Sequence, residues 1–186
     1  MAGAIALIDE TGLGNLSLRQ VARRVGVSHN APYRHFEDKE ALLAALAEEG
    51  FLALQDAMAT AREPFPVGTS QRLAAIGMAY VKFAIAHPAH YRLMFGEYRC
   101  DFNQNSTLAT AARGSFQVLV DTVLEGQKAG LFRPAEPLDM ARVAWSLVHG
   151  QAMLALDGKL QVAPDQLDAF LQFSNHLLVE GLKANP

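Results

Sequence analysis

A short stretch near the N-terminus holds the polar side chains that are best placed to act chemically. They can form hydrogen bonds and ionic contacts. Ser28, His29, Asn30, Tyr33 and Arg34 bring hydroxyl, imidazole, amide, phenol and guanidinium groups together within seven residues. Such groups can meet base edges and phosphate oxygens of nucleic acid. If Ser28 starts a helix, its hydroxyl and the first free N–H groups also form an anion site.

The elements that must position these side chains are two short helices joined by a tight turn. Val21, Ala22 and Val25 share one apolar face of a predicted helix over 18–25, with Ser17 as its N-cap. Gly26 can adopt positive φ, and Val27 would fill the corner. A second helix is expected over 29–36, with Ser28 as its N-cap. Such a pair projects its second helix into a DNA major groove.

The distribution of charge supports a nucleic-acid partner, although the whole chain has a net charge of −3 and a pI near 6.0. Between Ser17 and Lys39, five basic residues face only Glu37 and Asp38, a local net charge of +3, so the rest carries −6. Only the contacting surface must be positive. The alternative is structural, because helix pairs with a glycine turn also occur in helical proteins that never touch DNA.

Helical periodicity dominates the remaining sequence, which predicts an all-α protein with a sizeable core, since 51% of its residues are hydrophobic and 19% charged. One cysteine, no apolar run of membrane-spanning length and no signal peptide predict a soluble cytoplasmic protein outside the membrane. Apart from the pair above, helices are expected over 2–11, 39–62 with Asp38 as N-cap, 69–87, 89–95, 106–129, 138–157 and 165–184.

Pro64, Pro66 and Gly68 mark the best boundary in the chain. We therefore expect a helix-turn-helix domain over 1–46, with a connecting helix to about residue 62, and a larger helical bundle over 63–186 for ligand binding and dimerisation.

Residues Leu18 to Leu43 resemble the TetR family of transcriptional regulators. The resemblance lies in Val27-Ser28-His29-Asn30-Ala31-Pro32-Tyr33-Arg34-His35-Phe36 and in Asp38-Lys39-Glu40-Ala41-Leu42-Leu43. It implies phosphate contacts from Tyr33, His35 and Lys39, and from Ser17 and Arg19 on the opposite wall of the groove. It places Ser28, His29, Asn30, Pro32 and Arg34 at or near base edges. Arg34 is the best candidate for a bidentate contact with guanine, worth about 1–3 kcal/mol of discrimination.

One feature departs from the family pattern. Family members usually carry a basic N-terminal arm and a longer first helix, whereas the first basic residue here is Arg19. Either such an arm is missing from this sequence, or the protein binds DNA with fewer phosphate contacts and a shallow salt dependence.

The C-terminal part resembles a regulatory-domain subgroup named for Trp, His and Gly, through Gly130-Leu131-Phe132-Arg133-Pro134 and the helix segment 145–150. The 138–157 helix is apolar on nearly every side, so one face needs a partner, which a homodimer would supply. The 138–157 and 165–184 helices of the two subunits would pack in a four-helix interface. The alternative is the core of a monomer. Expected interface residues are Leu147, Gly150, Gln151, Leu154, Phe170, Ser174, Leu177, Leu178 and Gly181.

An aromatic and methionine-rich set of residues could line a pocket for an apolar or aromatic effector. The candidates are Tyr80, Phe83, Met94, Phe95, Tyr98, Phe116, Trp145, His149 and Met153. Ordinary core packing is the competing account for each of them, and His149 could be a core histidine.

No cofactor, metal or catalytic residue is expected. His87, His90, Cys100 and Asp101 could be metal ligands, but Pro88 breaks the helix between the histidines. Two hypotheses compete with a regulator: a helical metal-dependent hydrolase, and a ligand carrier without DNA binding. We expect a dimeric repressor that binds double-stranded operator DNA and is released by a small-molecule effector.

Overall fold

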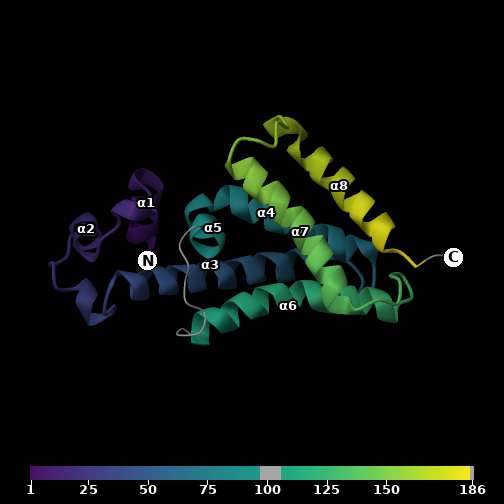
Figure 1. Ribbon diagram of the computed structural model, residues 1–186, viewed down its shortest axis with the longest axis horizontal. Helices are drawn as coiled ribbons and strands as arrows, with labels where there is room; N and C mark the ends of the chain where they lie inside the picture. The colour runs from purple at the N-terminus through teal and green to yellow at the C-terminus, as the bar shows by residue number, and fades with distance from the viewer. Residues whose placement is uncertain (97–105, 185–186) are drawn as a thin grey trace. The chain divides into compact units, whose positions relative to one another are not determined.

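The computed structural model describes residues 1–96 and 106–184, and eight α-helices and three short 3₁₀ helices form this part of the chain (Figure 1). The all-α fold expected from the sequence is confirmed. Its only β-type pairing within the described residues is an isolated bridge between Phe132 and Lys183. In order, the elements are α1 (Ala2–Thr11), η1 (Leu13–Asn15), α2 (Leu18–Arg24), η2 (Pro32–Arg34), α3 (Lys39–Arg62), α4 (Ser70–Ala86), α5 (Pro88–Phe95), α6 (Ser106–Lys128), α7 (Pro137–Leu156), η3 (Pro164–Gln166) and α8 (Leu167–Leu182).

The chain forms two compact units, which we describe separately. The first takes residues 1–52 and the described part of 87–112, and the second takes residues 53–86 and 113–184. The contact-based division therefore differs from the functional boundary expected near residue 63, since α5 packs with α1 in the first unit. A DNA-binding domain over 1–46 remains a prediction about function.

The first unit is built on α1, whose inward residues Ala4, Leu7 and Ile8 are buried, with α1 packing on α2, η1 and α5. Leu43 and Leu46 from the first turns of α3 are fully buried in the same unit. Asp38 starts α3 as expected, because its Oδ1 accepts a hydrogen bond of 2.8 Å from the backbone N–H of Ala41.

The second unit is organised around α4, which packs against both α7 and α8 (Figure 1). Gly77 on α4 allows close contact with α8, since a Cβ there would overlap the amide of Asn175. Val81 and Leu171 are fully buried in this core. No helix in the described part of the chain is both long and apolar enough to span a bilayer.

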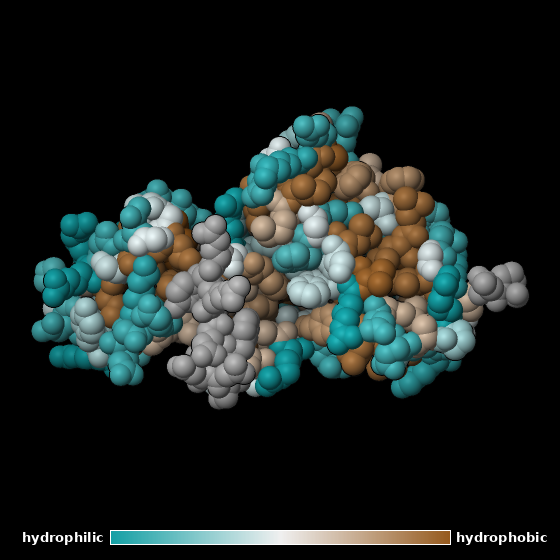
Figure 2. All heavy atoms as spheres, in the orientation of Figure 1, coloured by the Kyte–Doolittle hydropathy of each residue, from teal (hydrophilic) through white to brown (hydrophobic). Residues whose placement is uncertain are grey.

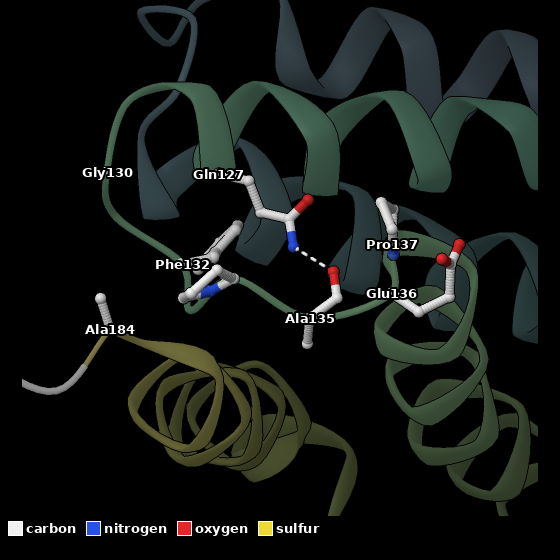
Figure 3. Close-up of a pocket in the computed structure, with 8 residues that line it drawn as sticks. Gln127, Gly130, Phe132, Ala135, Glu136, Pro137 and Ala184 are labelled. Atoms are coloured by element: carbon white, nitrogen blue, oxygen red, sulfur yellow. Dashed lines mark hydrogen bonds between the residues drawn. The ribbon is translucent and has the colours of Figure 1, made fainter.

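The loop between α6 and α7 is held by one side chain of α6 (Figure 3). The Nε2 of Gln127 donates to the carbonyl oxygens of Arg133, at 3.0 Å, and Ala135, at 2.8 Å. A guanidinium nitrogen of Arg133 in turn donates to the carbonyl of Gly181 at 2.6 Å, near the C-terminal end of α8. This loop therefore holds the C-terminal end of α8 in place. The same contacts account for the shallow hollow that Gln127 and Phe132 help to line.

Candidate nucleic-acid interface

The start of α2 and the turn after it match the expected helix-turn-helix. Ser17 Oγ accepts from the backbone N–H of Gln20 at 3.3 Å and donates to its side-chain oxygen at 2.8 Å, which caps α2. Gly26 has φ 73°, a conformation that favours glycine, and the N–H of Val27 closes the turn on the carbonyl of Ala22. The Val27 side chain does not fill the corner as expected, because it is 47% exposed.

The predicted helix over 29–36 is wrong, because only Pro32–Arg34 is helical and its form is 3₁₀. Pro32 has no N–H to donate to the carbonyl of Ser28 four residues earlier, and its ring disfavours an α-turn there. The Ser28 carbonyl instead accepts from Ala31 at 3.0 Å. Residues 28–35, which we call the recognition segment, are therefore a series of tight turns.

The recognition segment nevertheless presents nearly all its polar side chains to solvent. Pro32 is buried, so its ring supports the segment from inside rather than facing a base edge. Arg19 from α2 joins His29, Asn30 and Tyr33 around one open hollow at the surface. The exposed candidates are Arg19, Ser28, His29, Asn30, Tyr33, Arg34 and His35.

Positive charge at this surface comes from fewer residues than the sequence suggests. Arg24 forms a two-pronged ion pair with Glu10 of α1, with one N–O distance of 2.7 Å. The hydrogen bonds from Arg24 lower the pKa of Glu10, so both groups stay charged and neutralise each other. Arg19, Arg23 and Arg34 are exposed, which leaves their guanidinium groups accessible to phosphates.

Lys39, expected at a phosphate, donates instead from Nζ to two backbone carbonyls of η1, those of Leu13 at 3.2 Å and Gly14 at 3.3 Å. Ser17 is half-buried and its hydroxyl is engaged by Gln20. Both residues thus have structural partners inside the domain.

Four of the nine expected effector-pocket residues meet in the second unit. Tyr80 Oη accepts from Trp145 Nε1 at 3.0 Å and lies 3.0 Å from His149 Nδ1. The Phe116 ring packs on Trp145 with a centroid distance of 5.9 Å at 67°. Burial lowers the pKa of His149, so its ring is neutral at pH 7. We call Tyr80, Phe116, Trp145 and His149 the aromatic cluster.

Two of the other five candidates lie in the first unit of the chain. Met94 and Phe95 belong to the first unit, where the Phe95 ring lies 5.2 Å from that of Phe51 on α3. A Cβ on Gly50 would overlap Met94, which places that side chain against α3 too. Phe83 is buried on α4, Met153 is half-buried on α7, and Tyr98 lies outside the described residues.

The expected dimer residues divide into exposed and buried groups. Leu154 is 44% and Leu177 55% exposed, and Leu147, Gly150, Phe170, Leu178 and Gly181 are also at least partly exposed. A Cβ on Gly150 or Gly181 would meet only open space, so a partner helix could approach closely there. Gln151 and Ser174 are buried instead, because their positions turn toward the core of their own chain.

The two most exposed apolar side chains of these helices are Val143 at 58% and Phe173 at 60%, and neither is among the expected interface residues. Their spacing could have revealed them, since Val143, Leu147, Gly150 and Leu154 recur every three or four residues along one face of α7. Phe170, Phe173, Leu177 and Gly181 repeat the pattern on α8. Figure 2 shows hydrophobic surface gathered over α7 and α8. We call these eight residues the apolar stripes.

The two histidines considered as metal ligands, His87 and His90, lie next to each other, and His90 lies near a carboxylate. The rings of His87 and His90 lie 6.2 Å apart, and His90 Nε2 is 3.5 Å from a carboxylate oxygen of Glu49. Within residues 1–96 and 106–184, no group of three or more His, Cys, Asp or Glu side chains is placed to hold a metal ion. Cys100 and Asp101 lie outside the described residues.

A helix-turn-helix unit with an exposed polar segment, followed by a helical bundle, defines the class of bacterial helix-turn-helix regulators. The chain belongs to the TetR family. Residues 1–46 match the family model described as "Bacterial regulatory proteins, tetR family", and residues 73–177 match "Tetracyclin repressor-like, C-terminal domain". The chain therefore contains both domains of this family of regulatory proteins, and the relative BetI is named a transcriptional regulator. The Trp-His-Gly subgroup remains a prediction.

Relatives named as transcriptional regulators agree with this family, and a solved structure shares the fold. The regulator BetI of Cronobacter sakazakii is 30% identical over 83% of this chain and 72% of its own length. A regulator of Mycobacterium tuberculosis is 29% identical over 70% of this chain, and the match spans only 56% of that relative. A solved structure of a protein of unknown function from Rhodococcus sp. RHA1 shares 38% identity and a TM-score of 0.87, covering 98% of this chain and 93% of its own.

Proposed function

We propose that this regulator is a homodimeric repressor whose two recognition segments bind successive major grooves of an operator, and that a small molecule releases it. The observation that carries the DNA-binding part is the exposed recognition segment next to Arg19, with four of these side chains around one hollow. In this proposal Tyr33, His35 and Arg19 contact phosphates, while Ser28, His29, Asn30 and Arg34 face base edges.

The apolar stripes on α7 and α8 support the dimer. Four large apolar side chains there are 44–60% exposed, and burying such surface is the main favourable term in association. Two α7–α8 pairs would form a four-helix interface around a twofold axis. A twofold dimer matches an operator with two half-sites about one helical turn apart.

The aromatic cluster supports an effector with a flat apolar part. Trp145, Phe116 and His149 are half-buried, and their rings offer stacking surface, while the neutral His149 and the Tyr80 hydroxyl provide hydrogen-bonding groups. Release requires the effector to bind two conformations with different affinity, since equal affinity shifts no population. The continuous α3 belongs to the DNA-binding unit at its start and to the second unit at its end.

A mobility-shift assay tests the DNA-binding part, using a duplex selected from a random pool with the wild-type chain. Tyr33→Ala with Arg19→Ala should lower affinity about a hundredfold, because hydrogen bonds to charged groups contribute about 1.5–3 kcal/mol each. Lys159→Ala, which also removes a positive charge but lies in the second unit, is the control. Unchanged affinity of the double variant would contradict this placement of the DNA-binding surface, whereas failure of the wild-type chain to select any duplex would favour a ligand carrier.

Addition of flat apolar compounds to the bound complex tests the effector part. A compound that releases wild-type protein should lose potency with Trp145→Ala, while the DNA affinity of that variant without compound stays at the wild-type level. Equal potency on both proteins would place the effector elsewhere.

A further inference from the structure

We propose that Asn30 reads an adenine in each half-site of the operator, through two hydrogen bonds between its carboxamide and the major-groove edge of that base. This inference rests on the DNA-binding function proposed above and deepens it, because it assigns a particular base to one residue of the recognition segment.

Asn30 lies in the first turn of the recognition segment. The backbone N–H of Ala31 donates to the carbonyl of Ser28 at 3.0 Å, so His29 and Asn30 are the two central residues of this turn. Both of their side chains are exposed. Because backbone groups close the turn, the Asn30 carboxamide is not needed for that purpose and is accessible to a ligand.

The surroundings of Asn30 suit a base edge. Asn30 and His29 line one open hollow together with Arg19 of α2 and with Tyr33. In the proposed function Arg19 and Tyr33 contact phosphates, and phosphate contacts fix the register of a protein on the duplex while base edges are read in the groove. A polar side chain that shares a hollow with both phosphate-binding residues is therefore within reach of a base edge.

The chemistry of the carboxamide selects adenine. Adenine presents an acceptor, N7, beside a donor, the N6 amino group, in the major groove, and a carboxamide carries a donor and an acceptor that match this pair. Asn30 is the only carboxamide in the recognition segment. Guanine presents two acceptors instead, which suit the guanidinium of Arg34.

A role in the turn alone is the competing account, because asparagine is common in turns for conformational reasons. That role predicts that loss of the side chain distorts the turn and weakens binding at every base pair alike. Base readout predicts a loss that is confined to one base pair in each half-site. The two accounts therefore differ in a measurable way.

The test begins with selection of duplexes from a random pool, once with the wild-type chain and once with Asn30→Ala. Wild-type winners should share an A·T pair at one position of each half-site, and that position should be degenerate in the winners of Asn30→Ala. Replacement of this adenine by 7-deazaadenine in one half-site removes N7 but retains base pairing. Wild-type affinity should then fall about tenfold, as for damage to a bidentate base contact, whereas Asn30→Ala should bind both duplexes equally.

Two further variants complete the test. His29→Ala, the matched control from the same turn and hollow, should keep the roughly tenfold preference for adenine over 7-deazaadenine. Asn30→Asp has nearly the same shape but no donor for N7, so it should lose that preference.

The preference for adenine over 7-deazaadenine in Asn30→Ala would overturn the proposal, and so would wild-type winners without a shared adenine. Equal weakening of the operator and of a scrambled duplex by Asn30→Ala would also overturn it, in favour of the role in the turn. Failure of the wild-type chain to bind any duplex would instead refute the proposed function.

Discussion

The hydroxyl oxygen of Tyr80 lies 3.0 Å from Nδ1 of His149, although 69 residues separate them in the sequence. The same oxygen accepts the N–H of Trp145, so one hydroxyl joins α4 to two residues one turn apart on α7. Tyr80 is only 4% exposed, which makes these bonds costly to lose.

Tyr80→Phe should therefore lower the free energy of unfolding by about 1–3 kcal/mol, because it leaves half-buried polar atoms of Trp145 and His149 without this partner. Urea denaturation followed by circular dichroism measures the change. Tyr33→Phe removes a hydroxyl from a half-exposed side chain and serves as the matched control, with a change within about 0.5 kcal/mol. Equal stability of both variants would mean that the hydroxyl contributes nothing to the packing of α4 on α7.

Stability should decrease on acidification because two histidines are neutral in the folded protein. Burial lowers the pKa of both His90 and His149 below 6.5; for His90, Glu49 and Asp9 partly oppose that effect and His87 adds to it. The unfolded chain then binds protons that the folded chain does not, so the stabilising contribution is present above pH 6.5 and is lost as pH falls below it.

Urea midpoints between pH 7.5 and 5.5 check this pH dependence. His90→Gln and His149→Gln should each reduce the slope of stability against pH in that range. His35→Gln, at an exposed histidine, is the control and should leave the slope unchanged. A wild-type stability that stays constant or rises below pH 6.5 would contradict the prediction.

Glu125 on α6 faces two arginines in the second unit. Its carboxylate oxygens lie 3.1 Å from Arg72 Nε and 3.7 Å from Arg62, which also donates to Thr122 Oγ1 at 2.9 Å. The Arg72 contact is an ion pair rather than an aligned hydrogen bond, since neither atom satisfies hydrogen-bond geometry. The group links the end of α3 and the start of α4 to α6.

Glu125→Gln should destabilise the protein by about 1–3 kcal/mol, less than the about 3–5 kcal/mol of a fully buried pair, because a quarter of the Glu125 side chain is exposed. Thermal and urea denaturation measure the effect. Asp139→Asn removes an exposed carboxylate that pairs with Arg142 and should cost less than about 1 kcal/mol. If both variants lose the same small free energy of unfolding, the two arginines around Glu125 contribute no more stability than a surface ion pair.

The apolar stripes predict a loss of dimer when charge is placed on them. Phe173→Glu or Leu177→Glu puts a carboxylate into the proposed interface, where it would be buried without a partner. Sedimentation velocity should show a monomer for either variant and a dimer for the wild type. Gln172→Glu adds the same charge on another face of α8 and should remain dimeric. A monomeric wild type, or dimeric stripe variants, would refute this interface.

Local signals predicted most of the fold. Ser17 and Asp38 start their helices, and Gly26, Gly130 and Gly158 take positive φ where the sequence predicted stops. The error at the recognition segment also has a local cause, since Pro32 interrupts the helix that a Ser28 cap predicts. Contacts between helices that are distant in sequence could not be predicted. Apolar spacing indicated that Phe95 and Trp145 are buried, but it could not show that they belong to different units.

The site was predicted in its composition more than in its geometry. The polar residues of the recognition segment followed from residue type and charge, and most of them are exposed. The carbonyl partners of Lys39 could not be foreseen, because η1 lies about 25 residues away and a backbone acceptor leaves no trace in residue type.

A series of turns around a buried proline gains little from helical hydrogen bonding, so residues 28–35 depend on their neighbours for shape. A synthetic peptide with this sequence would sample many conformers and should not select a duplex. Grafting these eight residues alone onto another scaffold would likewise transfer their sequence without their conformation. Chimeras that exchange operator preference between relatives should therefore move the surrounding helices together with the segment.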